Sequence, residues 1–218
     1  LGITSNLEEN LSLALGSSGT TLYELTSAYS AFANLGSMTK PTVIKNIKSR
    51  QGKVLFTAEP ETTQPISSAT AHIMTSLMQS VVQNGTATKI KSLKRPVAGK
   101  TGTTNNFVDA WFIGYTPELV TGVWVGNDKD KPLGRNETGS RAAIPIWLQF
   151  MQKVLANKPK INFPISSNIQ YIKVQSESGK PAKYSDTSSS IELFSQDFLP
   201  EKEQPFIIQT QKSAETFQ

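Results

Sequence analysis

The sequence predicts an α+β fold in which helices flank an antiparallel sheet. Three runs rich in β-branched and aromatic residues follow one another closely, which is typical of a strand meander. Three further segments carry apolar residues at helical spacing. The predicted strands span residues 96–103, 108–115 and 119–126, and the predicted helices span residues 20–35, 67–84 and 140–155.

The first helix has a clear start and end in the sequence. Thr21 is followed three positions later by Glu24, a spacing at which two such residues form a capping box. Gly36 ends the helix, because glycine favours the backbone conformation found just beyond a helix. Two short β-rich runs follow, at residues 42–48 and 53–57, and the glycine-containing turn between them predicts a hairpin.

The other two helices are amphipathic as well. Ser67 or Ser68 caps the second helix and Gly85 ends it. Pro145 must lie in the first turn of the third helix or kink it, because proline has no N–H to donate. The residues expected to be buried are Ile73, Leu77, Met78 and Val81 in the second helix and Ile144, Trp147, Phe150, Met151 and Val154 in the third.

After residue 155 the composition shifts toward Lys, Ser, Thr, Gln and Pro. We therefore divide the chain into a domain segment at residues 1–155 and a C-terminal appendage at residues 156–218. Within the appendage, residues 169–175 and 190–194 are predicted to be short strands, and residues 201–218 are predicted to be frayed.

Composition excludes several classes of function. The chain has 218 residues, no cysteine, one histidine and a formal net charge of +5, so neither a disulfide nor a zinc site is expected. We interpret the basic cluster as a solvated face and not as a nucleic-acid surface; it comprises Lys89, Lys91, Lys94 and Arg95. No apolar run is long enough to span a bilayer, and the chain opens on Leu1, so we expect it to be a piece of a longer polypeptide.

The stretch from Val97 to Thr104 carries the most informative motif, a Lys100-Thr101-Gly102 triplet followed by two further threonines. Such a triplet forms one wall of some serine acyl-transfer sites. Alone it is a weak signal, since a glycine turn beside a lysine would look the same. The signal becomes specific because an Asp-Ala-Trp-Phe run and a Trp-Val-Gly run follow in the next two predicted strands.

This succession closely resembles the C-terminal half of the transpeptidase domain of class A (bifunctional) penicillin-binding proteins. The resemblance covers residues 1–155 and implies the penicillin-binding/serine β-lactamase-like fold, with only the C-terminal half present in this chain. Further stretches that look like this family lie at residues 11–16, 28–36, 132–134, 138–140 and 143–147.

The resemblance implies a peptidoglycan D,D-transpeptidase that forms a serine acyl-enzyme, uses no cofactor, and binds stem peptides, penicillin and other β-lactams. Lys100 and Thr103 are the implied catalytic residues: Lys100 supplies positive charge, and the Thr103 backbone N–H belongs to the oxyanion hole. Thr101, Gly102, Thr103 and Thr104 are the implied substrate-binding residues. Gly102 permits close approach of an extended peptide that pairs with the edge of the strand.

The nucleophile is not expected within this chain. Ser37 and Lys40 fit an S-x-x-K pattern, but they follow the end of a helix, whereas the nucleophilic serine of that motif should open one. Ser166 to Asn168 fit S-x-N, but they come after the triplet, in the wrong order for the family. We therefore expect the nucleophile and the S-x-N element on the N-terminal half of the domain, as a separate chain.

The same resemblance implies a membrane anchor upstream of this chain and a location on the outer face of the bacterial cell membrane. Two alternatives stay open. A serine β-lactamase or a D,D-carboxypeptidase would keep the triplet strand but pass the acyl group to water, although the Trp-Val-Gly-Asn-Asp strand end and the long tail argue against it. A non-enzymatic β-lactam-sensing domain is the second alternative, because no nucleophile is seen in this chain.

Overall fold

The computed structural model describes residues 1–129 and 131–200. The chain divides into two compact units, Leu1–Ile165 and Ser166–Gln218. The boundary therefore lies after Ile165 and not after residue 155 as predicted. Residues 156–165 stay with the first unit because Arg95 binds the carbonyl of Pro159 and the ring of Phe163 packs on Tyr115, with ring centroids 5.5 Å apart. The predicted fraying of residues 201–218 lies outside the described residues.

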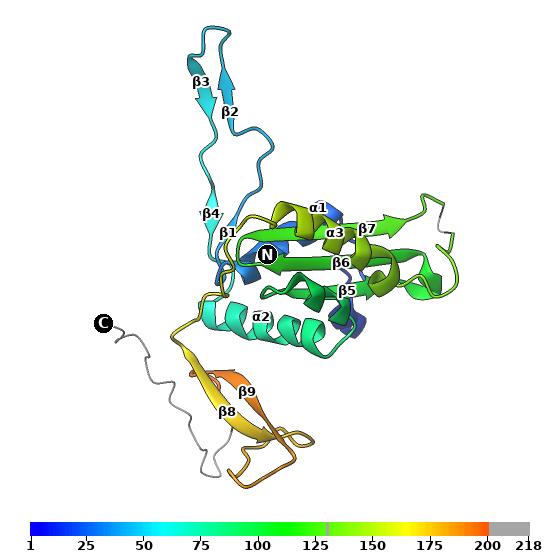
Figure 1. The fold of residues 1–218 in the computed structure, drawn as a ribbon, viewed down its shortest axis with the longest axis vertical. Coiled ribbons are helices and arrows are strands. Elements are labelled where there is room, and N and C mark those ends of the chain that lie inside the picture. Colours follow the sequence, from blue (N-terminus) through cyan, green and yellow to red (C-terminus); the bar gives the residue numbers. More distant parts are fainter. Residues whose placement is uncertain (130, 201–218) are drawn as a thin grey trace. The chain divides into compact units, whose positions relative to one another are not determined.

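The first unit is built on an antiparallel meander of β5 (Ala98–Thr103), β6 (Asp109–Thr116) and β7 (Leu119–Gly126), in the order β5-β6-β7 (Figure 1). The predicted meander is confirmed. Lys100 lies opposite Ile113 on β6 and Thr103 lies opposite Ala110. Because β6 is central, β5 and β7 each pair with one strand of this sheet and leave their outer edges unpaired within it.

Helices cover both faces of the sheet. Phe112 and Tyr115 are three positions apart on β6, so their side chains lie on opposite faces. The ring of Phe112 packs edge-on against Trp147 of α3 (Ile144–Val154), at 5.2 Å between ring centroids. The Tyr115 hydroxyl lies 3.0 Å from the Thr75 hydroxyl of α2 (Ser68–Gln83). The side chain of Tyr29, from α1 (Leu22–Ala33), packs on the same Tyr115 ring.

The helix termini follow the sequence closely. Thr21 and Glu24 form the predicted capping box of α1, and Ser67 caps α2. The third helix is shorter than predicted, because a π-helical turn, Gly139–Ala143, precedes α3 and places Pro145 in its first turn. Some of the helix residues that were expected to be buried are exposed to solvent: Leu77, Phe150 and Val154.

The N-terminal segment is tied to α1 through the Glu24 carboxylate. This group accepts hydrogen bonds from the Ser5 hydroxyl and from the Thr4 hydroxyl and backbone N–H, which hold the pKa of Glu24 well below its usual value. The short 3-10 turn Leu11–Leu15 follows, with Leu11 97% and Leu15 90% exposed. Large apolar side chains on a surface commonly mark a place where another segment packs.

Between α1 and α2 the chain forms two small antiparallel ladders. β1 (Met38–Thr39) pairs with β4 (Thr62–Thr63), and β2 (Asn46–Lys48) pairs with β3 (Val54–Thr57). The predicted hairpin is thus confirmed, with its first strand starting later than predicted. Two further 3-10 turns, Thr88–Leu93 and Asn105–Phe107, flank β5.

In its described part, residues 166–200, the second unit contains an antiparallel hairpin of β8 (Ile169–Gln175) and β9 (Ser189–Ser195), at the places predicted. Its connection is held by Lys173, whose Nζ donates to the carbonyls of Tyr184 and Asp186 at 2.7 and 2.8 Å. No helix within the described ranges is both long and apolar enough to cross a membrane.

Candidate active site

The triplet lies on the exposed half of an edge strand. Ala98 and Gly99, at the start of β5, are buried, whereas Lys100 and Thr103 are exposed. Burial of the first half anchors the strand in the core. The second half is therefore a rigid but accessible rim.

The backbone at this rim has groups that face outward, away from β6. The Thr104 N–H donates to the Asp109 carbonyl at 3.1 Å, so it points toward β6. Because N–H and C=O directions alternate along an extended strand, those of Thr103 and Thr101 point away from β6, toward the free edge. The edge thus presents the N–H and C=O of Thr103 and the N–H of Thr101 to an extended peptide that adds as a further strand, while the Thr101 C=O accepts from Lys100 Nζ.

Gly102 lies between these two threonines and faces Trp111. A Cβ at Gly102 would lie 3.2 Å from Trp111 Cβ, so any side chain here would press on that residue. Trp111 packs against Trp124, whose indole N–H donates to the Asp109 carboxylate at 2.8 Å. Because Gly102 has no side chain, nothing projects from the strand at this position on this face.

Thr104 ends the strand instead of pointing into the rim. Its hydroxyl accepts from the Asp109 N–H at 2.7 Å and lies 3.2 Å from the Asp109 carboxylate. In this conformation the Thr104 hydroxyl is therefore not free to bind a substrate, as its predicted role would require. Thr104 instead fixes the register of β5 against β6.

The hydroxyls of Thr101 and Thr103 share one face, and each has a hydrogen-bond partner from another segment. Thr101 Oγ1 lies 2.8 Å from Thr86 Oγ1, and Thr103 Oγ1 accepts from the Gly139 N–H at 3.1 Å. Gly139 comes so close that a Cβ there would lie 2.7 Å from the Gly102 carbonyl oxygen. The structure thus brings residues 86 and 139 to the triplet. The sequence had singled out 138–140 only as a family-like stretch, and gave no signal for Thr86.

Lys100 is held close to the same edge. Its Nζ donates to the Thr101 carbonyl at 2.9 Å. That carbonyl faces the free edge, so the ammonium group lies where a bound peptide or anion would arrive. The predicted residues Lys100, Thr101, Gly102 and Thr103 therefore form one continuous rim.

The two other candidate motifs lie in other parts of the chain. Ser37 lies in the turn between α1 and β1, outside any helix as predicted, and Lys40 pairs with Glu61 at 3.6 Å. Ser166 belongs to the second unit, where its hydroxyl accepts from the Asn168 N–H at 3.3 Å just before β8. Among the described residues, no group of three or more His, Cys, Asp or Glu is placed to hold a metal ion.

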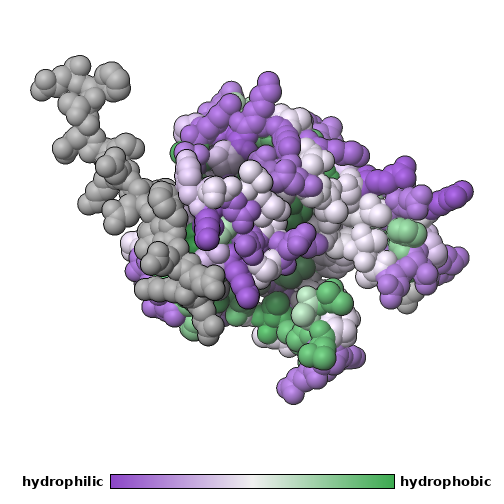
Figure 2. All heavy atoms as spheres, turned by 90° about the horizontal axis from the view of Figure 1, so that it is seen from below, coloured by the Kyte–Doolittle hydropathy of each residue, from purple (hydrophilic) through white to green (hydrophobic). Residues whose placement is uncertain are grey.

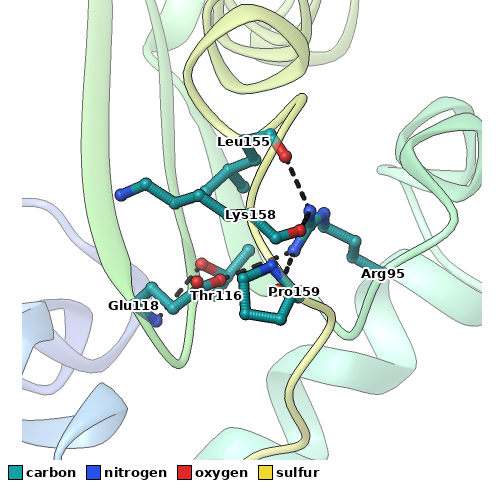
Figure 3. Close-up of polar contacts among 6 residues, drawn as sticks. All are labelled: Arg95, Thr116, Glu118, Leu155, Lys158 and Pro159. Atoms are coloured by element: carbon teal, nitrogen blue, oxygen red, sulfur yellow. Dashed lines mark hydrogen bonds and ion pairs between the residues drawn. The ribbon is translucent and has the colours of Figure 1, made fainter.

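Arg95 anchors the chain immediately before the triplet strand. Its guanidinium donates to the carbonyls of Leu155 and Pro159, each at 2.6 Å, and to that of Lys158 (Figure 3). It also pairs with Glu118 in the β6–β7 turn at 3.6 Å. The interpretation of Arg95 as part of a solvated basic face is therefore wrong. The Arg95 side chain is only 7% exposed, because its fork caps the carbonyls at the end of α3.

Comparison with known proteins agrees with this architecture. Residues 2–152 match the penicillin binding protein transpeptidase domain. The chain is 44% identical over 160 residues to penicillin-binding protein 1A of Aquifex aeolicus (strain VF5), covering 73% of this chain and 22% of that protein. The crystal structure of penicillin-binding protein 1A from Haemophilus influenzae superimposes with a TM-score of 0.82 at 26% identity, over 89% of this chain and 35% of that one.

A third similar protein is PonA1 from Mycobacterium tuberculosis, solved in complex with penicillin V. It has a TM-score of 0.62 at 30% identity, and the match covers 75% of this chain and 49% of that one. This chain therefore spans less than half of the length of each of these three relatives.

The edge strand with its triplet and the helices on both faces of the sheet define a transpeptidase-type domain, and the chain belongs to the penicillin-binding protein transpeptidase domain family. Within that family it is similar to penicillin-binding protein 1A, a class A member. The predicted fold class and family are confirmed.

Proposed function

We propose that this chain supplies one wall of the active site of a peptidoglycan D,D-transpeptidase that works through a serine acyl-enzyme. The observation that carries the proposal is the exposed second half of β5, where outward N–H groups, two hydroxyls and the Lys100 ammonium lie on one rim. A strand edge recognises a peptide main chain, and hydroxyls beside an ammonium recognise a carboxylate. A stem peptide ending in a carboxylate offers both.

Each rim residue has a role in this proposal. The Thr103 N–H, which faces outward, stabilises the oxyanion formed when serine attacks the carbonyl carbon of the penultimate residue. Lys100 places positive charge beside the carboxylate and the proton path. The donor peptide acylates the serine and releases its terminal residue, and an amine of a second stem peptide then attacks the ester to form the crosslink. A β-lactam enters the same site as a mimic of the donor, in keeping with the solved complex of PonA1 with penicillin V.

The serine is proposed to come from the N-terminal half of the same domain, outside residues 1–218. The first unit has a surface on which that N-terminal half could pack. The outer edge of β7 is unpaired within its sheet, and a groove of about 1440 Å³ lies between α1, the β7 edge and the β1–β4 region. Figure 2 shows apolar residues grouped at the surface beside polar ones. We also propose that this half is a separate chain, as predicted, and that an upstream anchor holds the protein on the outer face of the bacterial cell membrane.

Labelling the intact protein with a fluorescent penicillin tests this function. We expect one stable label on the protein, and peptide mapping should place it on a serine outside residues 1–218. A label that persists through isolation separates a transpeptidase from a serine β-lactamase, which would release it by hydrolysis. A label on Ser37 would contradict the assignment of the nucleophile, and no label on native protein would contradict the function itself.

A further inference from the structure

We propose that Thr86 is a positioning residue, which together with the Gly139 backbone N–H turns the hydroxyls of Thr101 and Thr103 into donors aimed at the substrate carboxylate. This inference rests on the proposed function and assigns to it residues that contact the rim. A hydroxyl has one hydrogen and two lone pairs, so a donor that approaches from behind leaves the hydrogen available in front.

The direction of the bond at Thr103 is fixed by its partner. A backbone N–H can only donate, so the 3.1 Å contact from Gly139 occupies a lone pair of Thr103 Oγ1. The Thr103 hydrogen is then free to point elsewhere. Gly139 can deliver this N–H only because it lacks a side chain: a Cβ there would lie 2.3 Å from the Trp111 carbonyl oxygen.

At Thr101 either hydroxyl of the 2.8 Å pair could donate. A carboxylate in front of Thr101 decides between the two directions, because an anion can only accept. Thr101 then donates forward and Thr86 donates to Thr101, which gives an aligned chain from Thr86 through Thr101 to the anion. Aligned hydrogen bonds polarise one another, so the forward bond is strengthened.

Thr86 is itself held in place from two sides. The Ser140 hydroxyl donates to the Thr86 carbonyl at 2.9 Å. On the other side, the N–H groups of Gly85 and Ala87 both donate to the Val81 carbonyl near the end of α2, at 3.1 and 3.2 Å. A threonine fixed in this way loses little freedom when it donates to Thr101, which makes it suited to orient a neighbour.

The test compares two ligands that differ only in the carboxylate. In the intact protein, Thr86→Val should slow acylation by benzylpenicillin about fivefold, the worth of one hydrogen bond, and should leave acylation by benzylpenicillin methyl ester unchanged. Thr86→Ser, which restores the hydroxyl, should recover the wild-type rate. Thr86→Ala should give the same ratio between the two ligands as Thr86→Val.

Thr70→Val is the matched control, because it removes an equivalent hydroxyl pair with Ser67, 2.8 Å long, at the start of α2. It should change neither rate. Equal slowing of both ligands by Thr86→Val would show a purely structural role and overturn the inference, as would unchanged rates for both. If the wild-type protein reacts with neither ligand, the proposed function fails, and this inference fails with it.

Discussion

Thr103→Pro in the intact protein is expected to slow acylation by benzylpenicillin about 100- to 1000-fold, while the protein stays folded. The substitution removes the N–H that we assign to the oxyanion hole, and loss of one such donor typically costs this much. Proline is tolerated at this position because the Thr103 N–H faces the free edge of β5 and bonds no neighbouring strand. Second-order acylation rates and the thermal unfolding midpoint are the two measurements.

Two variants separate the backbone role of Thr103 from other effects. Thr103→Val keeps the N–H and loses only the hydroxyl, so it should slow acylation by about tenfold or less. Gly102→Pro removes an N–H that points toward β6, so it should lower the unfolding midpoint more than Thr103→Pro, which costs the fold only the bond from the Gly139 N–H to the Thr103 hydroxyl. A wild-type acylation rate in Thr103→Pro would remove the oxyanion role from this residue.

Arg95→Met is expected to lower the free energy of unfolding by about 3 kcal/mol. It leaves Glu118 without its cation and the carbonyls of Leu155, Lys158 and Pro159 without their shared donor. Chemical denaturation of the intact protein measures the change. Because Arg95 lies only three positions before Ala98, the first residue of β5, the loss should also loosen the rim.

Exposed Lys91 supplies the control for Arg95. Lys91→Met should change the stability by no more than about 0.5 kcal/mol, as expected for a surface position. Arg95→Lys should recover little of the lost stability, since an ammonium group cannot reproduce the planar fork that reaches several carbonyls at once. If Arg95→Met were as stable as Lys91→Met, the contacts of the Arg95 guanidinium would contribute nothing to the stability of the fold.

Local features of the fold were predictable from the sequence. The capping box at Thr21 and Glu24 depends only on residues three apart, and the meander on β-rich runs joined by a short turn around Pro117. The widened turn Gly139–Ala143 was not predictable, because the helical pattern of residues 140–155 runs through it without a break. Its cause is tertiary: Gly139 sits tightly against the Gly102 and Trp111 carbonyls.

The same distinction holds for the site. Lys100, Thr101 and Thr103 are adjacent in sequence, so the triplet identifies them directly. Thr86 and Gly139 reach the strand only through the packing of α2 and the turn before α3, and no local pattern joins positions 86, 101 and 139. The interpretation of Arg95 as part of a solvated face was wrong for a related reason. Its lysine neighbours suggest a solvated face, whereas its carbonyl partners lie about sixty positions further along the chain.

The crystal structure of the intact protein acylated by benzylpenicillin tests the central claim most directly. The account predicts that the acyl carbonyl oxygen accepts a hydrogen bond of about 3 Å from the Thr103 N–H, with the ligand carboxylate beside the Thr101 and Thr103 hydroxyls. It also predicts that the acylated serine lies outside residues 1–218. An acyl oxygen turned away from Thr103, or an adduct on a residue of this chain, would contradict it.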